Sequence, residues 1–335
     1  MDALRGGAVL LVVVWHAFSI PYPTVPVGVE WVSNFLSVYR IPLLMFLSGL
    51  LLDQSLAKPT GQYVEGKLRR IAWPLVVWSA ILVLIGWPEA DPGNWWFWLG
   101  DGAHLWYLGI LLACYAIGLL TKWVHPLVFL VVGLVAMQFV ESDIAFVNNT
   151  LWFGLYFFAG AVMSRWLEWW LRRGPIIPSL FLIAASAWGA YSATVNGYVP
   201  IAHWRPFLLS ILGVVAVVWL ATRLPRAPWL EWVGQRSIVF YVAHVPFIFL
   251  TVVLVAAALP DWLTYAAVLI VTGVGCTLLA RYFNGTVLFE FPQVRRRRPE
   301  TTEAAPTDAV ATAAISGTTS RWRLRRRIPS ERTRP

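Results

Sequence analysis

Residues 3–20, ALRGGAVLLVVVWHAFSI, form an apolar stretch that contains a single arginine and a single histidine. A helix of about 20 apolar residues crosses the ~30 Å hydrocarbon core of a bilayer. Ionisable side chains inside such a helix are costly, and they are functional candidates by default. The stretch therefore predicts a membrane span whose arginine and histidine have a functional role.

The rest of the chain has the same character. Its 335 residues are 59% apolar and only 13% charged, with a mean hydropathy of +0.65, which excludes a soluble domain, a disordered chain and a coiled coil. Nine further stretches are long enough to span, and they lie near 34–52, 71–87, 104–121, 125–141, 150–168, 178–195, 204–222, 238–259 and 263–283. We therefore expect an all-α integral membrane protein with about ten transmembrane helices.

Charges in the loops predict the orientation. Alternate loops are basic, and basic loops stay in the cytoplasm. The basic loops carry Lys58, Lys67, Arg69 and Arg70, then Lys122, then Arg165, Arg172 and Arg173, then Arg223, Arg226 and Arg236. We expect both termini to be cytoplasmic and the protein to be a multi-pass protein of the cell inner (plasma) membrane. Arg40 and Arg205 break the pattern, so they either line a polar cavity or extend to the headgroups.

The C-terminal segment differs in composition. Residues 294–335 hold 11 Arg and 4 acidic residues, so +7 of the net charge of +9 lies there. We expect a membrane domain over 1–285 and a disordered, Arg-rich cytoplasmic tail over 286–335, with the tail on anionic lipid. The lipid bilayer is thus an expected partner. Nucleic acid is not expected as a partner, because the basic residues are not on a folded domain.

The cysteines suggest no metal or redox chemistry. Cys114 and Cys276 lie far apart inside apolar stretches. No CxxC or Cys/His cluster accompanies them. We expect two buried packing residues and no metal site.

The first span places its two ionisable groups on one face. Arg5 and His16 are eleven residues apart, which is close to three full helical turns and about 16 Å along the axis. Asp2 precedes Arg5 by three residues and can pair with it. An imidazole within the membrane suits a general base. It also suits a core histidine that only hydrogen-bonds to a neighbouring helix.

Other polar residues fall inside or beside later spans, and we expect them to line a cavity. They are Arg40 and Ser48 in the second span, His104, Trp106 and Tyr107 at the fourth, Arg205 at the eighth, and Tyr241 and His244 in the ninth. Lys67, Arg69 and Arg70 precede the third span, where Lys67 and Arg70 at i,i+3 suit phosphate groups in the cytoplasm.

These stretches together resemble the membrane acyltransferase 3 family. The resemblance begins with Asp2-x-x-Arg5-Gly6 and a histidine eleven residues after Arg5. It continues, in the same order, with Arg40-x-Pro42 and Ser48-Gly49, the basic stretch before Pro74, Leu105-Trp106-Tyr107-Leu108, and Tyr241-x-x-His244. It covers about residues 1–285.

The resemblance implies a multi-span O-acyltransferase. Such an enzyme moves an acetyl, succinyl or similar group from acyl-CoA to a sugar hydroxyl of a cell-envelope glycan, a glycolipid or a secondary metabolite. It implies a catalytic His16 with Arg5 and Asp2 in the same motif, and acyl-CoA contacts at Lys67, Arg69 and Arg70. Acyl-CoA would be a co-substrate and no bound cofactor is implied. A carbohydrate or glycolipid acceptor would be the second partner.

Two other classes stay open on the residues alone. A transporter or flippase of a lipid-linked or anionic substrate would use Arg5, His16, Arg40 and Arg205 along its path. A scaffold would depend on its arginine tail and not on His16. Release of free CoA from a labelled acyl-CoA distinguishes the enzyme from both.

Overall fold

The described part of the chain is built from helices and contains no strand. The computed structural model describes residues 1–101, 104–140, 142–195 and 204–292. Its α-helices are α1 (Asp2–Ser19), α2 (Val27–Ser37), α3 (Arg40–Leu50), α4 (Leu52–Leu56), α5 (Thr60–Lys67), α6 (Trp73–Leu84), α7 (Trp106–Gly118), α8 (Pro126–Ala136), α9 (Ala145–Met163), α10 (Leu167–Leu171), α11 (Ile176–Val195), α12 (Trp204–Ala221), α13 (Pro228–Gln235), α14 (Ser237–Val255) and α15 (Asp261–Tyr282).

Seven helical stretches are long and apolar enough to cross a membrane. They are α1, the joined α2–α3 stretch Val27–Leu50, α9, α11, α12, α14 and α15. This confirms an all-helical protein with many candidate spans. The count of ten is reached only with shorter helices, because the spans expected at 71–87, 104–121 and 125–141 correspond to α6, α7 and α8 with 12, 13 and 11 residues.

The shortness of α6 has a local cause. A π-helical turn over Leu68–Ala72 joins α5 to α6, so one helical path runs from Thr60 to Leu84 with an irregular turn inside it. Such turns often occur at functional sites. The path ends before Gly86, whose positive φ of 73° stops a helix. Lys67 therefore lies immediately before a local irregularity.

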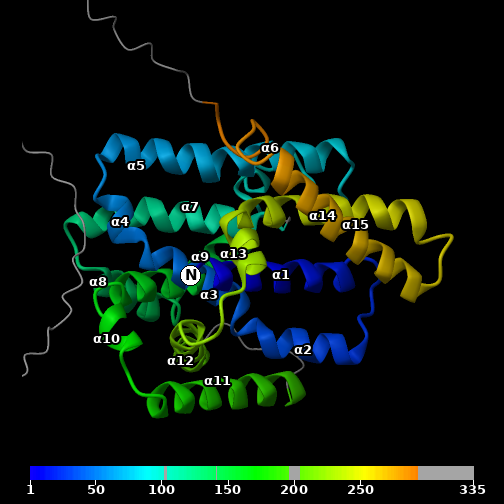
Figure 1. Ribbon diagram of the computed structural model, residues 1–335. Helices are drawn as coiled ribbons and strands as arrows, with labels where there is room; N and C mark the ends of the chain where they lie inside the picture. The colour runs from blue at the N-terminus through cyan, green and yellow to red at the C-terminus, as the bar shows by residue number, and fades with distance from the viewer. Residues whose placement is uncertain (102–103, 141, 196–203, 293–335) are drawn as a thin grey trace, which may run out of the picture. The chain divides into compact units, whose positions relative to one another are not determined.

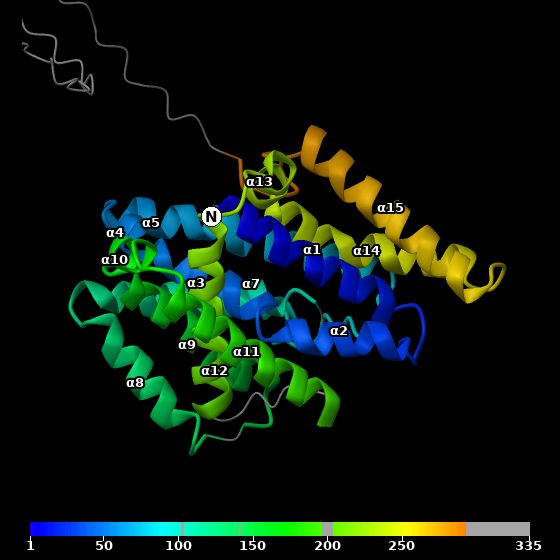
Figure 2. The same cartoon turned by 60° about the horizontal axis from the view of Figure 1, so that its bottom comes forward.

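The centre of the bundle depends on a close contact between two helices. Gly49 of α3 and Gly160 of α9 face each other's helix, and a Cβ atom on either would collide with a backbone oxygen, of Phe157 or Phe46 respectively. Small residues of this kind let helix backbones approach closely in membranes. Figures 1 and 2 show α3 and α9 side by side, and α3 also packs against α1. The close contact therefore fixes the position of α9 relative to α3.

A second close contact holds the N-terminus of α1. Gly6 of α1 and Gly234 of α13 lie so close that a Cβ on Gly6 would meet the Leu230 carbonyl, and one on Gly234 would meet the Asp2 carbonyl. Further along, α1 packs against α14 and α3. The face of α1 that bears Arg5 and His16 thus lies between these helices.

Residues 286–292, expected in the tail, belong instead to the folded part. Phe289 is buried, and the indoles of Trp73 and Trp78 donate hydrogen bonds to the carbonyls of Val287 and Leu288 at 2.6 and 3.0 Å. These contacts join chain segments more than 200 residues apart, so no local pattern reveals them. The rest of the expected tail, from residue 293, lies outside the described residues.

Candidate active site

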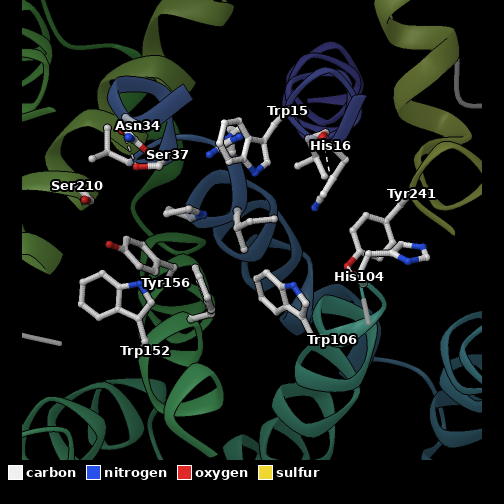
Figure 3. A pocket seen from close by; sticks show the side chains of 16 residues that line it. Trp15, His16, Asn34, Ser37, His104, Trp106, Trp152, Tyr156, Ser210 and Tyr241 are labelled. Atoms are coloured by element: carbon white, nitrogen blue, oxygen red, sulfur yellow. Dashed lines mark hydrogen bonds between the residues drawn. The ribbon is translucent and has the colours of Figure 1, made fainter. Parts of the chain in front are cut away.

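His16 projects from α1 into a cavity of about 380 Å³. Figure 3 shows His16 and Trp15 on one wall, with Trp152 and Tyr156 of α9 opposite and Trp106 of α7 nearby. Asn34, Ser37 and Ser210 add polar groups to the lining. A mainly aromatic cavity with a few polar groups is the usual form of a site for a small organic molecule.

Hydrogen bonds fix the tautomer of His16. Its Nδ1 lies 3.0 Å from the Val12 carbonyl, and the Nδ1 of His244 lies 3.1 Å from the Phe240 carbonyl. A carbonyl oxygen only accepts, so Nδ1 carries the hydrogen in both rings. His244 Nε2 then has a free lone pair, and it lies 3.1 Å from His16 Nδ1.

This arrangement leaves the other nitrogen of His16 available for chemistry. Nε2 of the neutral ring carries a lone pair, and none of the hydrogen bonds among the described residues involves it. A base held in one tautomer by a second group is the usual arrangement of a catalytic histidine. His16 can therefore accept a proton at Nε2 while His244, which is fully buried, holds Nδ1.

His104 and Tyr241 complete the cluster. His104 packs against the His244 ring with 5.0 Å between the centroids, and its Nε2–H donates to the Val242 carbonyl at 3.1 Å. The Tyr241 hydroxyl donates to the His104 carbonyl and accepts from the Tyr107 amide. Nδ1 of His104 is buried and has no hydrogen-bond partner among the described residues. In the part of the chain that the structure describes, no group of side chains is placed to hold a metal ion.

A second cavity, of about 270 Å³, lies on the other side of Tyr241. Arg5, Ser48, Lys67 and Tyr107 line it, and Tyr241 lines both cavities. The cavity with the cations and the cavity with His16 are thus two separate spaces that share the side chain of Tyr241. Tyr241 is therefore the side chain at which the two cavities adjoin.

Lys67 is one of the two cations that line this second cavity. Its ammonium is 3.4 Å from the centre of the Tyr115 ring and 3.4 Å from the Ser55 hydroxyl. Burial, followed by the nearby cations Lys58, Arg70 and Arg5, lowers the pKa of Lys67 to about 8. None of the ion pairs among the described residues includes it, so its charge is available to an anion.

Arg5 lies at the same cavity but not in the expected pair with Asp2. Its guanidinium donates to the Leu47 carbonyl at 3.3 Å. The Asp2 carboxylate instead accepts from the Gln235 amide at 3.4 Å, because the close contact of α1 with α13 brings that side chain near. Arg5 lines both this cavity and a third one, of about 310 Å³, next to Asp53 and Arg165.

Arg69 and Arg70 do not line the cavity with Lys67, so the expected phosphate pair of Lys67 and Arg70 is separated. Arg69 binds the Glu290 carboxylate at 3.1 Å and the Phe291 carbonyl at 3.0 Å, while Arg70 is largely exposed and reaches Glu290 at 3.3 Å. Neither lines the cavity that contains Lys67. Both hold the segment after α15 against the π-helical turn.

The two exceptional arginines have different positions. Arg40 lines the His16 cavity, with its guanidinium 5.5 Å from the centre of the Trp15 ring. Arg205 is exposed at the start of α12, 5.3 Å from the Trp204 ring centre, and lines none of the three cavities described above. Both arginines break the loop-charge pattern in the same way, so the sequence could not predict which of them lines a cavity.

Several residues of the site were absent from our sequence candidates. They are Trp15, Asn34, Ser37, Trp152, Tyr156 and Ser210 in the first cavity and Tyr115 in the second. Trp15 adjoins His16 in sequence. The other side chains are uncharged and common in membrane spans, so composition and spacing gave no signal for them.

Comparison with known proteins adds one finding. A family model, Acyl_transf_3, described as an acyltransferase domain, matches residues 1–281. No curated protein and no solved structure shows a significant match.

Proposed function

Since the chain belongs to the acyltransferase 3 family, which makes it a membrane acyltransferase, we propose that it transfers an acetyl, succinyl or similar group from acyl-CoA to a sugar hydroxyl. The acceptor would be a cell-envelope glycan, a glycolipid or a secondary metabolite. The observation that carries this proposal is a histidine with a free Nε2 in an aromatic cavity, next to a cation-lined cavity.

The cation-lined cavity supports acyl-CoA as the donor. Coenzyme A carries several phosphate charges, and Lys67 and Arg5 offer cations at the end of α1 that we expect to be cytoplasmic. Arg69 and Arg70 lie outside that cavity. They would contribute to donor binding only indirectly, by holding the segment after α15 in place. The thioester is already activated, so the reaction needs no bound cofactor. The location that follows is the plasma membrane, with the donor supplied from the cytoplasm.

The chemistry then requires one base. His16 Nε2 removes the proton of the sugar hydroxyl as its oxygen attacks the thioester carbonyl. The new C–O bond forms, the C–S bond breaks, and the imidazolium returns the proton to the departing sulfur as CoA thiol. His244 Nε2 accepts the Nδ1–H of His16 throughout, which stabilises the imidazolium.

The decisive experiment measures release of CoA thiol from acetyl-CoA and succinyl-CoA by the full chain in nanodiscs, with an extract of envelope glycolipids and glycans as acceptor. We expect His16→Ala to lower the rate at least about 100-fold, the usual contribution of a general base. His125→Asn is the matched control, because His125 only caps α8 with its ring nitrogen and asparagine also caps helices. Wild-type rates in His16→Ala would disprove the role of His16.

A cellular experiment identifies the product. Mass spectrometry of envelope glycans and secreted metabolites compares a deletion strain with the same strain carrying either wild type or His16→Ala. We expect an acyl ester that is present only with wild type. A transporter would leave acyl content unchanged and would release no CoA in the nanodisc assay.

A further inference from the structure

An apolar groove lies beside the His16 cavity, between α1 and α2. It has a volume of about 260 Å³ and is lined mainly by aliphatic and aromatic side chains, among them Leu11, Val14, Phe18 and Val32. Val14 and Val32 are 43% and 48% exposed. In a chain that spans a membrane, such side chains face lipid, so the groove opens toward the bilayer.

Arg40 and Trp15 connect the groove to the active-site cavity, because both residues line both spaces. Arg40 takes part in no ion pair among the described residues, and its guanidinium lies over the Trp15 ring. An unpaired cation within a membrane is costly and marks a binding path. The boundary between groove and cavity therefore offers a site for an anion.

Ser33 provides a second, independent indication of a polar ligand at the groove. It is 7% exposed, it lines the groove, and its hydroxyl has no hydrogen-bond partner in the part of the chain that the structure describes. A buried hydroxyl without a partner is destabilising. A ligand that fits here combines an apolar chain with oxygen atoms near Arg40 and Ser33.

We propose that the acceptor is an amphiphile in which a phosphate joins the sugar to a long apolar chain. The chain lies in the groove between α1 and α2, the phosphate binds Arg40, and the sugar extends past Trp15 so that its hydroxyl reaches His16. The inference rests on the proposed function and selects a phosphate-linked glycolipid among the possible acceptors. A planar guanidinium with several donors suits phosphate oxygens.

The test uses dodecyl phosphate that carries a terminal diazirine, photolysed with the full chain in phosphatidylcholine nanodiscs. We expect cross-links on residues 11–18 and 28–36. Unlabelled dodecyl phosphate should compete, whereas dodecanol and the surrounding phosphatidylcholine should not. Competition by dodecanol as strong as by dodecyl phosphate would show that ordinary lipid fills the groove, and it would overturn the proposal.

Matched variants test the two halves of the ligand separately. Arg40→Gln should lower labelling about tenfold or more, with Arg40→Lys restoring part of it and the exposed Arg205→Gln leaving it unchanged. Gly28→Leu should fill the groove, since a Cβ on Gly28 meets open space and this residue lines the groove. Gly61→Leu, at an equally open position on α5, is its control. Unchanged labelling in both Arg40→Gln and Gly28→Leu would refute the site.

The same samples distinguish this inference from the proposed function. CoA release that depends on His16, together with no phosphate-dependent labelling, would remove only the glycolipid site. Absence of CoA release that depends on His16 would remove the proposed function, whatever the probe labels.

Discussion

Replacing His244 isolates its contact with His16. Asparagine places its side-chain polar group near the position of Nδ1 and provides no acceptor at the position of Nε2. Glutamine reaches about as far as Nε2 and can accept the His16 Nδ1–H. The pair of variants therefore removes and restores one acceptor, 3.1 Å from His16 Nδ1, in a fully buried position.

The magnitude follows from the competing hydrogen bond to Val12. A hydrogen bond to a group that becomes charged contributes about 1.5–3 kcal/mol, or roughly 10- to 150-fold in rate. The Val12 carbonyl, at 3.0 Å, still holds the same hydrogen when His244 is lost, so the tautomer persists. We expect the lower end of the range, about a tenfold fall in kcat for His244→Asn, with little change in KM for acyl-CoA.

The assay is steady-state release of CoA thiol in nanodiscs, with thermal unfolding as a control for folding. His244→Gln should recover most of the kcat that His244→Asn loses. If a folded His244→Asn protein keeps the wild-type kcat, or if glutamine is no better than asparagine, then His244 does not position His16.

Three further predictions concern the rest of the molecule. The pKa of Lys67 is lowered to about 8, so its charge is present below that pH and is lost above it. In wild type, kcat/KM for acyl-CoA should therefore fall as the pH rises through about 8, and in Lys67→Arg it should not. Initial rates measured across this pH range test this. Gly49→Ala should destabilise the protein by about 1–3 kcal/mol, because the new Cβ meets backbone; thermal unfolding measures this against Gly273→Ala, where space is open. Glu290→Gln should release the segment after α15, seen as faster proteolysis there with kcat unchanged.

Hydrophobicity predicted the fold well where a span is long and regular. The stretches that became α1, α9, α11, α12, α14 and α15 were all expected as spans, since their lengths match a bilayer. It misplaced the third span, expected at 71–87, because one helical path runs from Thr60 to Leu84 and contains a π-helical turn. Such a turn depends on tertiary contacts and has no period of its own in the sequence.

Helical periodicity predicts one face of the first span for Arg5 and His16, and in the structure His16 lines the first cavity and Arg5 the second. Pairings outside a single helix were not predictable in the same way. The spacing placed Asp2 within reach of Arg5, but α13 crosses α1 there and the Gln235 amide donates a hydrogen bond to the Asp2 carboxylate instead. Arg69, expected among the acyl-CoA contacts, forms an ion pair with Glu290, which lies 221 residues further along the chain.

Tyr241 has a consequence for the cell beyond the reaction. It is the side chain that the two main cavities share, and its hydroxyl is tied to backbone on both sides. If the cavities open to opposite compartments, this ring is the seal that keeps ions and protons from leaking between them. In that arrangement, a smaller side chain at position 241 would raise the proton permeability of the membrane, an effect separate from catalysis and measurable in sealed vesicles.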